Sequence, residues 1–211
     1  AILCGVEGAT PKKHGKAVVV RSGAANVALL LEPGETLVVD FGQNAAAVPS
    51  FNVEGAAGTR LTIRTAEMLN DGNGEKVRGN DGPAGTPYRA NLRGIRAGID
   101  YILRDGAQSY ETRFSYFGYR YISFTCDRPV TLRNVRSTPI SSVSAAMECG
   151  TLETGNDAVN RLVSNVRWGM LSNYLSVPTD CPQRDERLGW TADTQVFTET
   201  GTFFANTDAF F

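Results

Sequence analysis

Apolar and polar side chains alternate along Arg60-Leu61-Thr62-Ile63-Arg64-Thr65. Successive side chains of a β-strand point to opposite faces, so Leu61 and Ile63 would face a protein interior while the residues between them face water. This stretch therefore predicts a half-buried strand that packs one face against a core.

Similar short runs of β-branched and aromatic residues recur from about Ala17 to Pro139, separated by turn residues. Such spacing is typical of an antiparallel β-sandwich. The segments Glu32-Pro33-Gly34-Glu35 and Asp105-Gly106 contain the Pro and Gly that tight turns need, and Asn70 to Pro87 predicts a long exposed loop. We expect the strands Ala17–Arg21, Val27–Leu31, Thr36–Asp40, Phe51–Glu54, Arg60–Thr65, Asp100–Arg104, Glu111–Ser115, Tyr119–Thr125 and Thr131–Arg136.

The hydrophobic period changes near Ser141. Between Asn156 and Tyr174 the apolar residues follow the i, i+3, i+4, i+7 spacing of an amphipathic helix, with Asn156 as the expected N-cap. A second helix is expected from Thr191, as N-cap, to about Ala205. The change of period predicts a domain boundary near residues 140–150. Two helices are too little for a core of their own, so they require further packing partners.

Composition and charge exclude several functions. The chain of 211 residues has 21 basic and 22 acidic side chains, and its net charge of -1 gives no field that would attract nucleic acid or an anionic membrane. The longest apolar run, Val27 to Leu31, is far too short to cross a bilayer. Because the sequence begins at Ala1 rather than Met, a targeting segment can lie upstream, and the compartment is left open.

Few residues of the chain could bind a metal or form disulfides. The four cysteines are widely spread, which favours buried free thiols over a zinc site or a disulfide scaffold. His14 is the single histidine, and it lies in a Pro/Lys/Gly-rich stretch. We therefore expect no cofactor, no His-based zinc site and no Ser-His-Asp triad, and metal binding near the Asn70 to Pro87 loop is left open. Any catalysis must use carboxylates.

One loop concentrates such groups. The fourteen residues from Asp180 to Asp193 contain four carboxylates, two arginines and one tryptophan. A carboxyl group near other carboxylates and an apolar ring keeps its proton to higher pH, and it can then act as a general acid near neutrality. Glycoside cleavage needs such an acid, and Glu186 is the candidate.

The other residues of this loop suggest substrate contacts. Asp180 and Asp193 are candidates for binding sugar hydroxyls, Arg184 for orienting a carboxylate or a hydroxyl, and Trp190 for contacting the apolar face of a sugar ring. Structural roles are the alternatives. Asp193 can simply stabilise the start of the second helix, and Trp190 can simply be core.

The sequence also resembles a known family. The stretch Asp180-Cys181-Pro182-Gln183-Arg184-Asp185-Glu186-Arg187-Leu188-Gly189-Trp190-Thr191-Ala192-Asp193 is similar to the signature of bacterial α-L-rhamnosidases of glycoside hydrolase family 78, which usually have Gly in place of Ala192. The stretches Val39–Asn44, Ala66–Leu69 and Arg113–Tyr121 are similar to the β-sandwich domain before the rhamnosidase barrel, although Ala45 to Pro49 lacks the Gly-Trp pair common in relatives.

The resemblance implies a fold and a reaction. It implies a jelly-roll-like antiparallel β-sandwich in residues 1–145, followed in 146–211 by the first helices of a truncated (α/α)6 catalytic barrel. It makes Glu186 the general acid, with Asp180, Arg184, Trp190 and Asp193 around a rhamnose. The parent enzyme would hydrolyse terminal α-L-rhamnose from glycosides or polysaccharides with inversion. The general base would be a Glu in later helices of the barrel, so we expect this chain alone to be inactive without the remainder of the barrel.

Two other interpretations remain open. The β-rich part can be a non-catalytic carbohydrate-binding or scaffolding module, which exposed aromatic residues aligned on one sheet face would favour. Phe114, Tyr116, Phe117, Tyr119 and Tyr121 supply aromatic residues, although packing into the interior is their commoner use. Alternatively, the same barrel can act on a different sugar, which the loop signature argues against.

Overall fold

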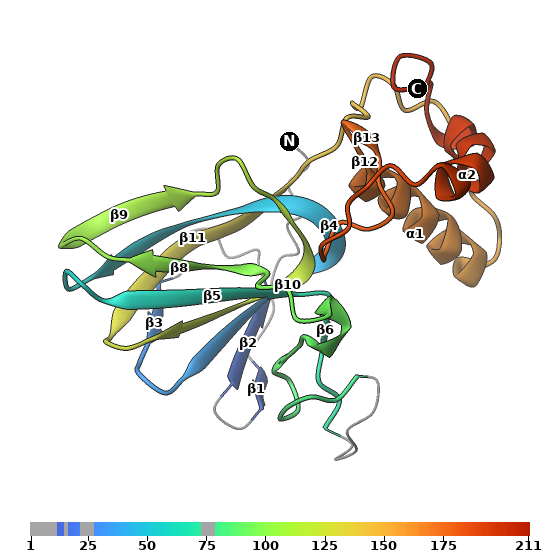
Figure 1. Cartoon of the computed structure of the whole chain (residues 1–211). Coiled ribbons are helices and arrows are strands. Elements are labelled where there is room, and N and C mark those ends of the chain that lie inside the picture. Colours follow the sequence, from blue (N-terminus) through green and yellow to red (C-terminus); the bar gives the residue numbers. More distant parts are fainter. Residues whose placement is uncertain (1–11, 15–16, 22–27, 73–78) are drawn as a thin grey trace.

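The computed structural model describes residues 12–14, 17–21, 28–72 and 79–211, and it shows a β-rich part followed by two α-helices (Figure 1). Between the strands lies one short 3-10 helix, η1 (Ala90–Leu92), and the two α-helices are α1 (Asp157–Asn173) and α2 (Thr191–Phe204). The strands are β1 (Lys12–His14), β2 (Ala17–Arg21), β3 (Leu29–Leu31), β4 (Thr36–Gly55), β5 (Arg60–Ala66), β6 (Met68–Leu69), β7 (Pro87–Tyr88), β8 (Gly98–Ile102), β9 (Gly106–Glu111), β10 (Phe117–Cys126), β11 (Val130–Pro139), β12 (Tyr174–Leu175) and β13 (Val177–Pro178).

Strand β4 belongs to both layers of the β-rich part. Its first half pairs with β2 and β10, and its second half pairs with β9 and β11. Strands β5 and β8 extend the first layer beyond β10, and β3 extends the second beyond β11 (Figure 1). The expected sandwich is confirmed, with one difference: among the described strand pairs, β2 and β4 run parallel.

An ion pair with a buried carboxylate lies near the point where β4 changes layer. The Asp40 carboxylate accepts hydrogen bonds from Arg120 Nε at 2.7 Å and Arg120 Nη2 at 2.8 Å. The backbone N–H of Gly42 donates to the same carboxylate at 2.7 Å, and Gly42 has a φ of 78°, a conformation that glycine adopts without strain. A bidentate pair of this kind fixes both strands at the bend.

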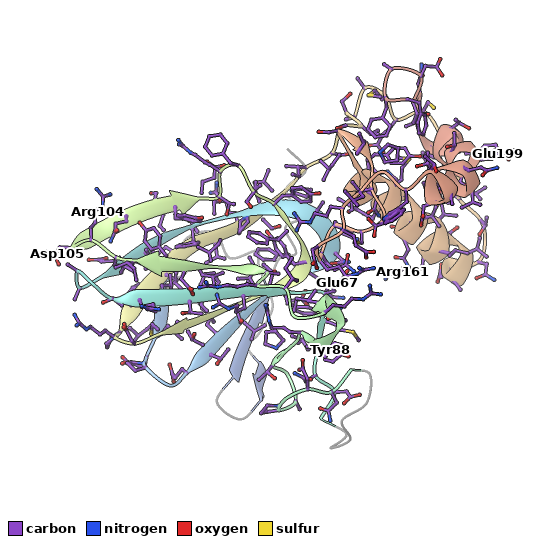
Figure 2. The ribbon with its side chains drawn as sticks, viewed as in Figure 1. Glu67, Tyr88, Arg104, Asp105, Arg161 and Glu199 are labelled. Carbon is purple, nitrogen blue, oxygen red and sulfur yellow. The ribbon has the colours of Figure 1, made fainter. Side chains whose placement is uncertain are left out.

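Apolar side chains fill the space between the two layers (Figure 2). Leu61 and Ile63 are both fully buried, which confirms the alternation expected for β5. Phe51 from β4 meets Phe124 from β10 edge to face, with ring centroids 5.7 Å apart. Burial of one such side chain contributes roughly 1.5–3 kcal/mol, so this core holds the two layers together.

Several expected elements differ in their bounds. The strands expected at Thr36–Asp40 and Phe51–Glu54 are parts of the single strand β4. The strand expected at Glu111–Ser115 is wrong, because β9 ends at Glu111 and the chain then leaves the sheet, with Phe114 fully exposed. Both expected turns are present, and Arg104 and Asp105 lie in the turn that connects β8 in one layer to β9 in the other (Figure 2).

The described part of the loop from Asn70 to Pro87 is organised around a buried amide. The Asn70 side chain accepts from the N–H of Asp81 at 2.6 Å and donates to Thr86 Oγ1 at 2.9 Å. Asp81 in turn accepts from the N–H groups of Arg89 and Ala90, at the start of η1. This segment therefore fixes the backbone that leads to Arg93, the residue directly after η1.

Helix α1 begins as expected, since the Asn156 side chain accepts from the N–H of Ala158 at 2.9 Å. For α2 the expected cap is wrong: Thr191 is its first helical residue, and Trp190 occupies the N-cap without a side-chain hydrogen bond. The end of α1 packs on the sheet, where Ser172 Oγ accepts from the N–H of Ala46 at 3.1 Å. Among the described residues, no helix is both long and apolar enough to cross a membrane.

Apolar residues of both helices face solvent. Val159 and Leu162 of α1 are exposed, as are Val196 and Phe203 of α2. The buried cluster beneath the helices is small, with Met170, Leu171 and Tyr174 among its members. The described thiols are free as expected, but only Cys181 is buried, because Cys126 is half-buried and Cys149 exposed; Cys4 lies outside the described residues.

Candidate active site

Residues 179–190, here called the acid-bearing loop, run from β13 to α2 and rest on the sheet at Gly118 of β10. A Cβ atom at Gly118 would lie 2.7 Å from the backbone N of Gln183 and 2.7 Å from the carbonyl carbon of Pro182. These are backbone atoms, which cannot move aside alone. The neighbouring Cys181 and Pro182 are buried. The start of the loop is therefore tightly packed against the β-rich part.

Glu186 lies in an unusual backbone conformation at the centre of the loop. Its φ is 95° and that of Arg187 is 48°, so two consecutive residues with side chains occupy the region that favours glycine. Strained residues of this kind concentrate at active sites and persist where surrounding contacts hold them. The Glu186 side chain is 37% exposed, which leaves it accessible to a ligand.

Two guanidinium groups hold the Glu186 carboxylate. Arg184 forms an ion pair with Glu186 Oε2 from within the loop. Arg93 approaches the same oxygen from the segment after η1, with Nη1 at 3.7 Å. Cations at this distance stabilise the ionised carboxylate. The repulsion by neighbouring carboxylates that the sequence suggested is therefore opposed by two arginines.

Asp180 joins the beginning of the loop to its end. Its Oδ1 accepts from the N–H of Leu188 at 3.3 Å, which ties residues eight positions apart. Potential ligand atoms of Asp180, Cys181 and Glu186 all lie within 4.8 Å of one another. Burial, together with the hydrogen bond to Asp180, raises the pKa of the Cys181 thiol, so the thiolate that binds metals is disfavoured. A metal would also have to displace Arg184, so these donors suit a hydrogen-bonded turn better than a metal site.

Asp180 and Asp193 line one cleft of about 330 Å³ between α1, the loop and the first turn of α2. Its floor is apolar, with Met170, Tyr174 and Phe197 among its residues. Arg184, Glu186 and Trp190 are not among the lining residues, although Trp190 is 47% exposed. The structure thus brings Glu186, Arg184 and Asp180 together, and it brings Asp180 and Asp193 together around a cleft, with Trp190 at the start of α2.

Sequence reasoning did not identify the contacts made by the β-rich part. The Tyr116 ring lies under the Arg187 guanidinium, 4.3 Å from ring centroid to Cζ. Arg93, Tyr116 and Gly118 bring two segments of the β-rich part to the loop, the one after η1 and the one that enters β10. These residues are about 65 to 95 positions away in sequence, and none belongs to a pattern that signals the contact.

Family models match both parts of the chain. The concanavalin-like domain of bacterial alpha-L-rhamnosidases matches residues 31–140, and the bacterial alpha-L-rhamnosidase 6 hairpin glycosidase domain matches residues 147–211. The chain belongs to the bacterial α-L-rhamnosidase family. The family expected from the acid-bearing loop is thus confirmed, and its members are glycoside hydrolases.

Individual rhamnosidases agree with this membership. An alpha-L-rhamnosidase of Streptomyces avermitilis is 39% identical over 175 residues, which cover 82% of this chain and 15% of the relative. An alpha-L-rhamnosidase of Formosa agariphila is 34% identical over 174 residues, covering 82% of this chain and 18% of the relative. The chain therefore spans less than a fifth of the length of these curated relatives.

Solved rhamnosidase structures share the fold. The Streptomyces avermitilis enzyme complexed with L-rhamnose superposes with a TM-score of 0.65 at 35% identity, covering 86% of this chain and 17% of that one. The alpha-L-rhamnosidase from Dictyoglumus thermophilum gives a TM-score of 0.65 at 29% identity, covering 86% of this chain and 20% of that one. The β-sandwich with two following helices is thus an arrangement found in rhamnosidases.

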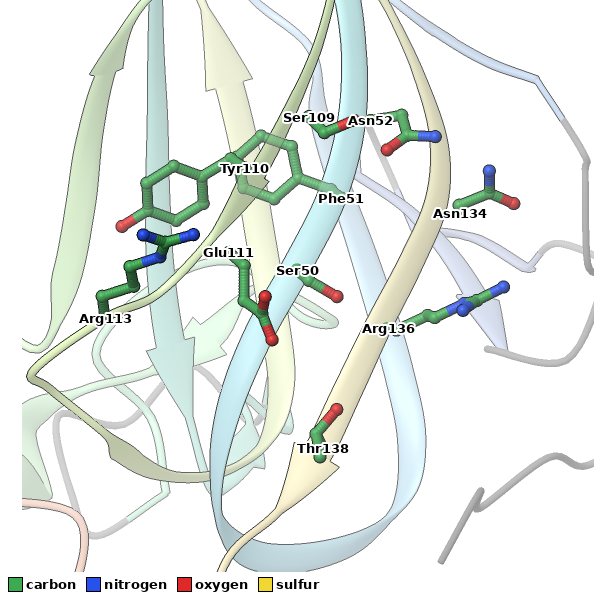
Figure 3. Close-up of a pocket in the computed structure, with 10 residues that line it drawn as sticks. All are labelled: Ser50, Phe51, Asn52, Ser109, Tyr110, Glu111, Arg113, Asn134, Arg136 and Thr138. Atoms are coloured by element: carbon green, nitrogen blue, oxygen red, sulfur yellow. The ribbon is translucent and has the colours of Figure 1, made fainter. Parts of the chain in front are cut away.

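A second hollow lies on the β-rich part, away from the acid-bearing loop. It measures about 620 Å³ and follows strands β4, β9 and β11 (Figure 3). Its aromatic residues are Phe51, which is buried in the core, and Tyr110, which is half-buried. The lining residues are Ser50, Phe51, Asn52, Ser109, Tyr110, Glu111, Arg113, Asn134, Arg136 and Thr138.

The five aromatic residues considered for a carbohydrate-binding face do not form an exposed row. Phe117 and Tyr119 are buried, Tyr116 and Tyr121 are half-buried, and Phe114 is exposed. This distribution favours packing over an aromatic sugar-binding platform in the β-rich part.

Proposed function

We propose that this chain is the acid-bearing part of an α-L-rhamnosidase, in which Glu186 is the general acid for hydrolysis of terminal α-L-rhamnosides. The observation that carries the proposal is the placement of Glu186. Its carboxylate sits at the centre of a strained loop whose start is packed against the β-rich part, and it is held by Arg184 and lies beside Asp180. The Streptomyces avermitilis relative complexed with L-rhamnose supports the choice of sugar.

In the proposed reaction, protonated Glu186 gives its proton to the glycosidic oxygen as the bond from that oxygen to the anomeric carbon breaks. A water attacks the anomeric carbon from the opposite face and loses a proton to a second carboxylate, which inverts the configuration. The family resemblance assigns that base to a Glu in later helices of the barrel. The products are L-rhamnose and the released alcohol.

The contacts of Arg184 suggest how Glu186 becomes protonated. In this structure Arg184 stabilises the ionised carboxylate. We infer that a bound sugar draws the Arg184 guanidinium toward its hydroxyls and excludes water from Glu186. Both changes favour the protonated acid. Asp180 and Asp193 bind hydroxyls from the cleft that they line. Trp190, exposed at the start of α2, contacts the apolar face of the ring.

We also propose the division into residues 1–145 and 146–211, with the second part opening the barrel. The gap between the two matched ranges, 31–140 and 147–211, supports a boundary there. The remaining barrel helices are the expected partners of the exposed apolar residues Val159, Leu162, Val196 and Phe203. Covering them removes apolar area from water, at about 25 cal/mol per Å².

The test compares the natural full-length parent with its Glu186→Gln variant on rhamnosides of different leaving groups. Loss of a general acid costs about 10²- to 10⁴-fold in rate. The loss should be large for an alkyl or flavonoid-type alcohol, which needs a proton to leave, and small for 2,4-dinitrophenol, which leaves as the anion. An equal loss for both leaving groups would contradict the acid assignment, and a fully active variant would reject a catalytic role.

A further inference from the structure

The β-rich part contacts the acid-bearing loop on both sides of Glu186. Gly118 meets the loop at Pro182 and Gln183, and Tyr116 meets it at Arg187. These two contacts lie three to four residues before Glu186 and one residue after it. The segment that carries the acid is therefore fixed at both ends by residues outside the helical part.

The Tyr116 contact acts directly on the strained turn. The Arg187 guanidinium stacks on the Tyr116 ring, an attraction between a cation and an aromatic face. From the same side chain, Nε donates to the carbonyl oxygen of Arg184 at 3.2 Å. Arg187 thus joins Tyr116 to the residue that pairs with Glu186. Without the ring, Arg187 has less to keep it extended across the turn, and the positive φ of Glu186 loses a support.

The Gly118 contact sets how closely the loop approaches strand β10. Gly118 is buried in β10, where the neighbouring Phe117 and Tyr119 point into the β-rich part. Since a Cβ would come within 2.8 Å of Pro182 Cγ as well as of the two backbone atoms, any larger residue must push the loop outward. A displacement of about 1 Å at a catalytic group can cost on the order of 100-fold in rate.

We propose that Tyr116 and Gly118 are positioning residues for Glu186, so that the β-rich part is a structural component of the active site. This inference rests on the proposed function. It predicts that changes in the β-rich part alter the chemical step, although neither residue touches the substrate.

The experiment uses the natural full-length parent and the variants Tyr116→Ala, Tyr116→Phe and Phe114→Ala. Phe114 is the matched control, because it is an aromatic residue two positions away that is fully exposed. We expect Tyr116→Ala to lower kcat by about ten- to 100-fold with little change in KM for a rhamnoside with a poor leaving group. Tyr116→Phe keeps the ring face and should retain most of the rate, as should Phe114→Ala.

A readout specific to acid positioning separates this role from a general loss of folding. For the 2,4-dinitrophenyl rhamnoside, which needs no proton, Tyr116→Ala should keep nearly the rate of the native enzyme. Equal losses for both leaving groups, or native kcat for both, would overturn the proposal. Gly118→Ala should show the same selective loss.

A double-mutant cycle keeps the test independent of any one variant. Arg187→Met removes the stacking partner from the loop side, and Tyr116→Ala with Arg187→Met should be no slower than the slower single variant. Multiplying losses would show that the two side chains act separately and would refute the proposal. The proposed function fails separately: an inactive native parent overturns it and this inference with it, whereas an active parent whose Glu186→Gln variant is impaired leaves the Tyr116 result decisive.

Discussion

Arg93 is the cation beside Glu186 that can be removed with least damage to the loop. Its side chain is 67% exposed, and it comes from the segment after η1 rather than from the acid-bearing loop. The other groups around the Glu186 carboxylate are Arg184, Asp180 and Cys181. We predict that Arg93→Gln lets Glu186 keep its proton to a higher pH, because one stabiliser of the ionised form is lost.

The size of this effect follows from the distance and the exposure. Two unit charges 3.7 Å apart interact with about 1 kcal/mol in bulk water, and exposed ion pairs usually contribute ~0.2–1 kcal/mol. Since a tenfold change in proton affinity would need about 1.36 kcal/mol, the expected effect on Glu186 is small and upward. The active form of a general acid is protonated. The basic limb of the pH–rate profile should therefore move upward.

The assay is the pH dependence of kcat/KM for the full-length parent on a rhamnoside with a poor leaving group. Arg96→Gln is the matched control. It removes the same charge three residues away, from a side chain that pairs with Asp100 instead. Raising the salt to about 1 M, where the Debye length is about 3 Å, should shrink the difference between Arg93→Gln and the native enzyme. A basic limb that stays in place or moves downward, or an equal shift in Arg96→Gln, would refute the reasoning.

Three further outcomes are expected. Arg120→Met should destabilise the β-rich part by about 2–4 kcal/mol, since Asp40 stays buried without its bidentate partner; denaturant unfolding measures this, and adding Asp40→Asn should restore part of the loss. Iodoacetamide at pH 8 should alkylate exposed Cys149 before Cys126 and Cys181, as mass spectrometry of peptides can check, because burial raises the pKa of Cys126 to about 11 and also raises that of Cys181. The 211-residue chain alone should show no rhamnoside turnover and should associate through its exposed apolar helix faces, which activity assays and light scattering will test.

Local patterns predicted the parts of the fold that depend on local forces. The alternation in β5 and the Asn156 cap of α1 both follow from residues a few positions apart. Strand β4 was harder, because its two halves lie in different layers and the residues between them include Gly42 and Pro49, which usually interrupt strands. The β9 error has a similar cause: Gly106 opens that strand, and the sequence pattern assigned it only to a turn.

The candidate site also combines residues that a local motif identifies with contacts that it cannot predict. The residues expected to act on the sugar all lie between Asp180 and Asp193, in the loop and the first turn of α2, so a single motif could identify them. Their supports come from elsewhere in the chain: Arg93 and Tyr116 reach the loop only because the β-rich part folds beneath it. No sequence pattern links Tyr116 to Arg187, since nothing in the intervening residues fixes where the loop will rest on the sheet.

The positioning of Glu186 depends on both parts of the chain. A turn with two consecutive residues at positive φ is disfavoured in isolation, so the geometry of Glu186 depends on contacts made after both parts have folded. The loop packs on buried Gly118 of β10 and on the ring of Tyr116, which directly precedes β10. The core of the β-rich part holds both residues in place. Substitutions that loosen this core far from the sugar should therefore slow proton donation by Glu186, even where every residue of the acid-bearing loop is unchanged.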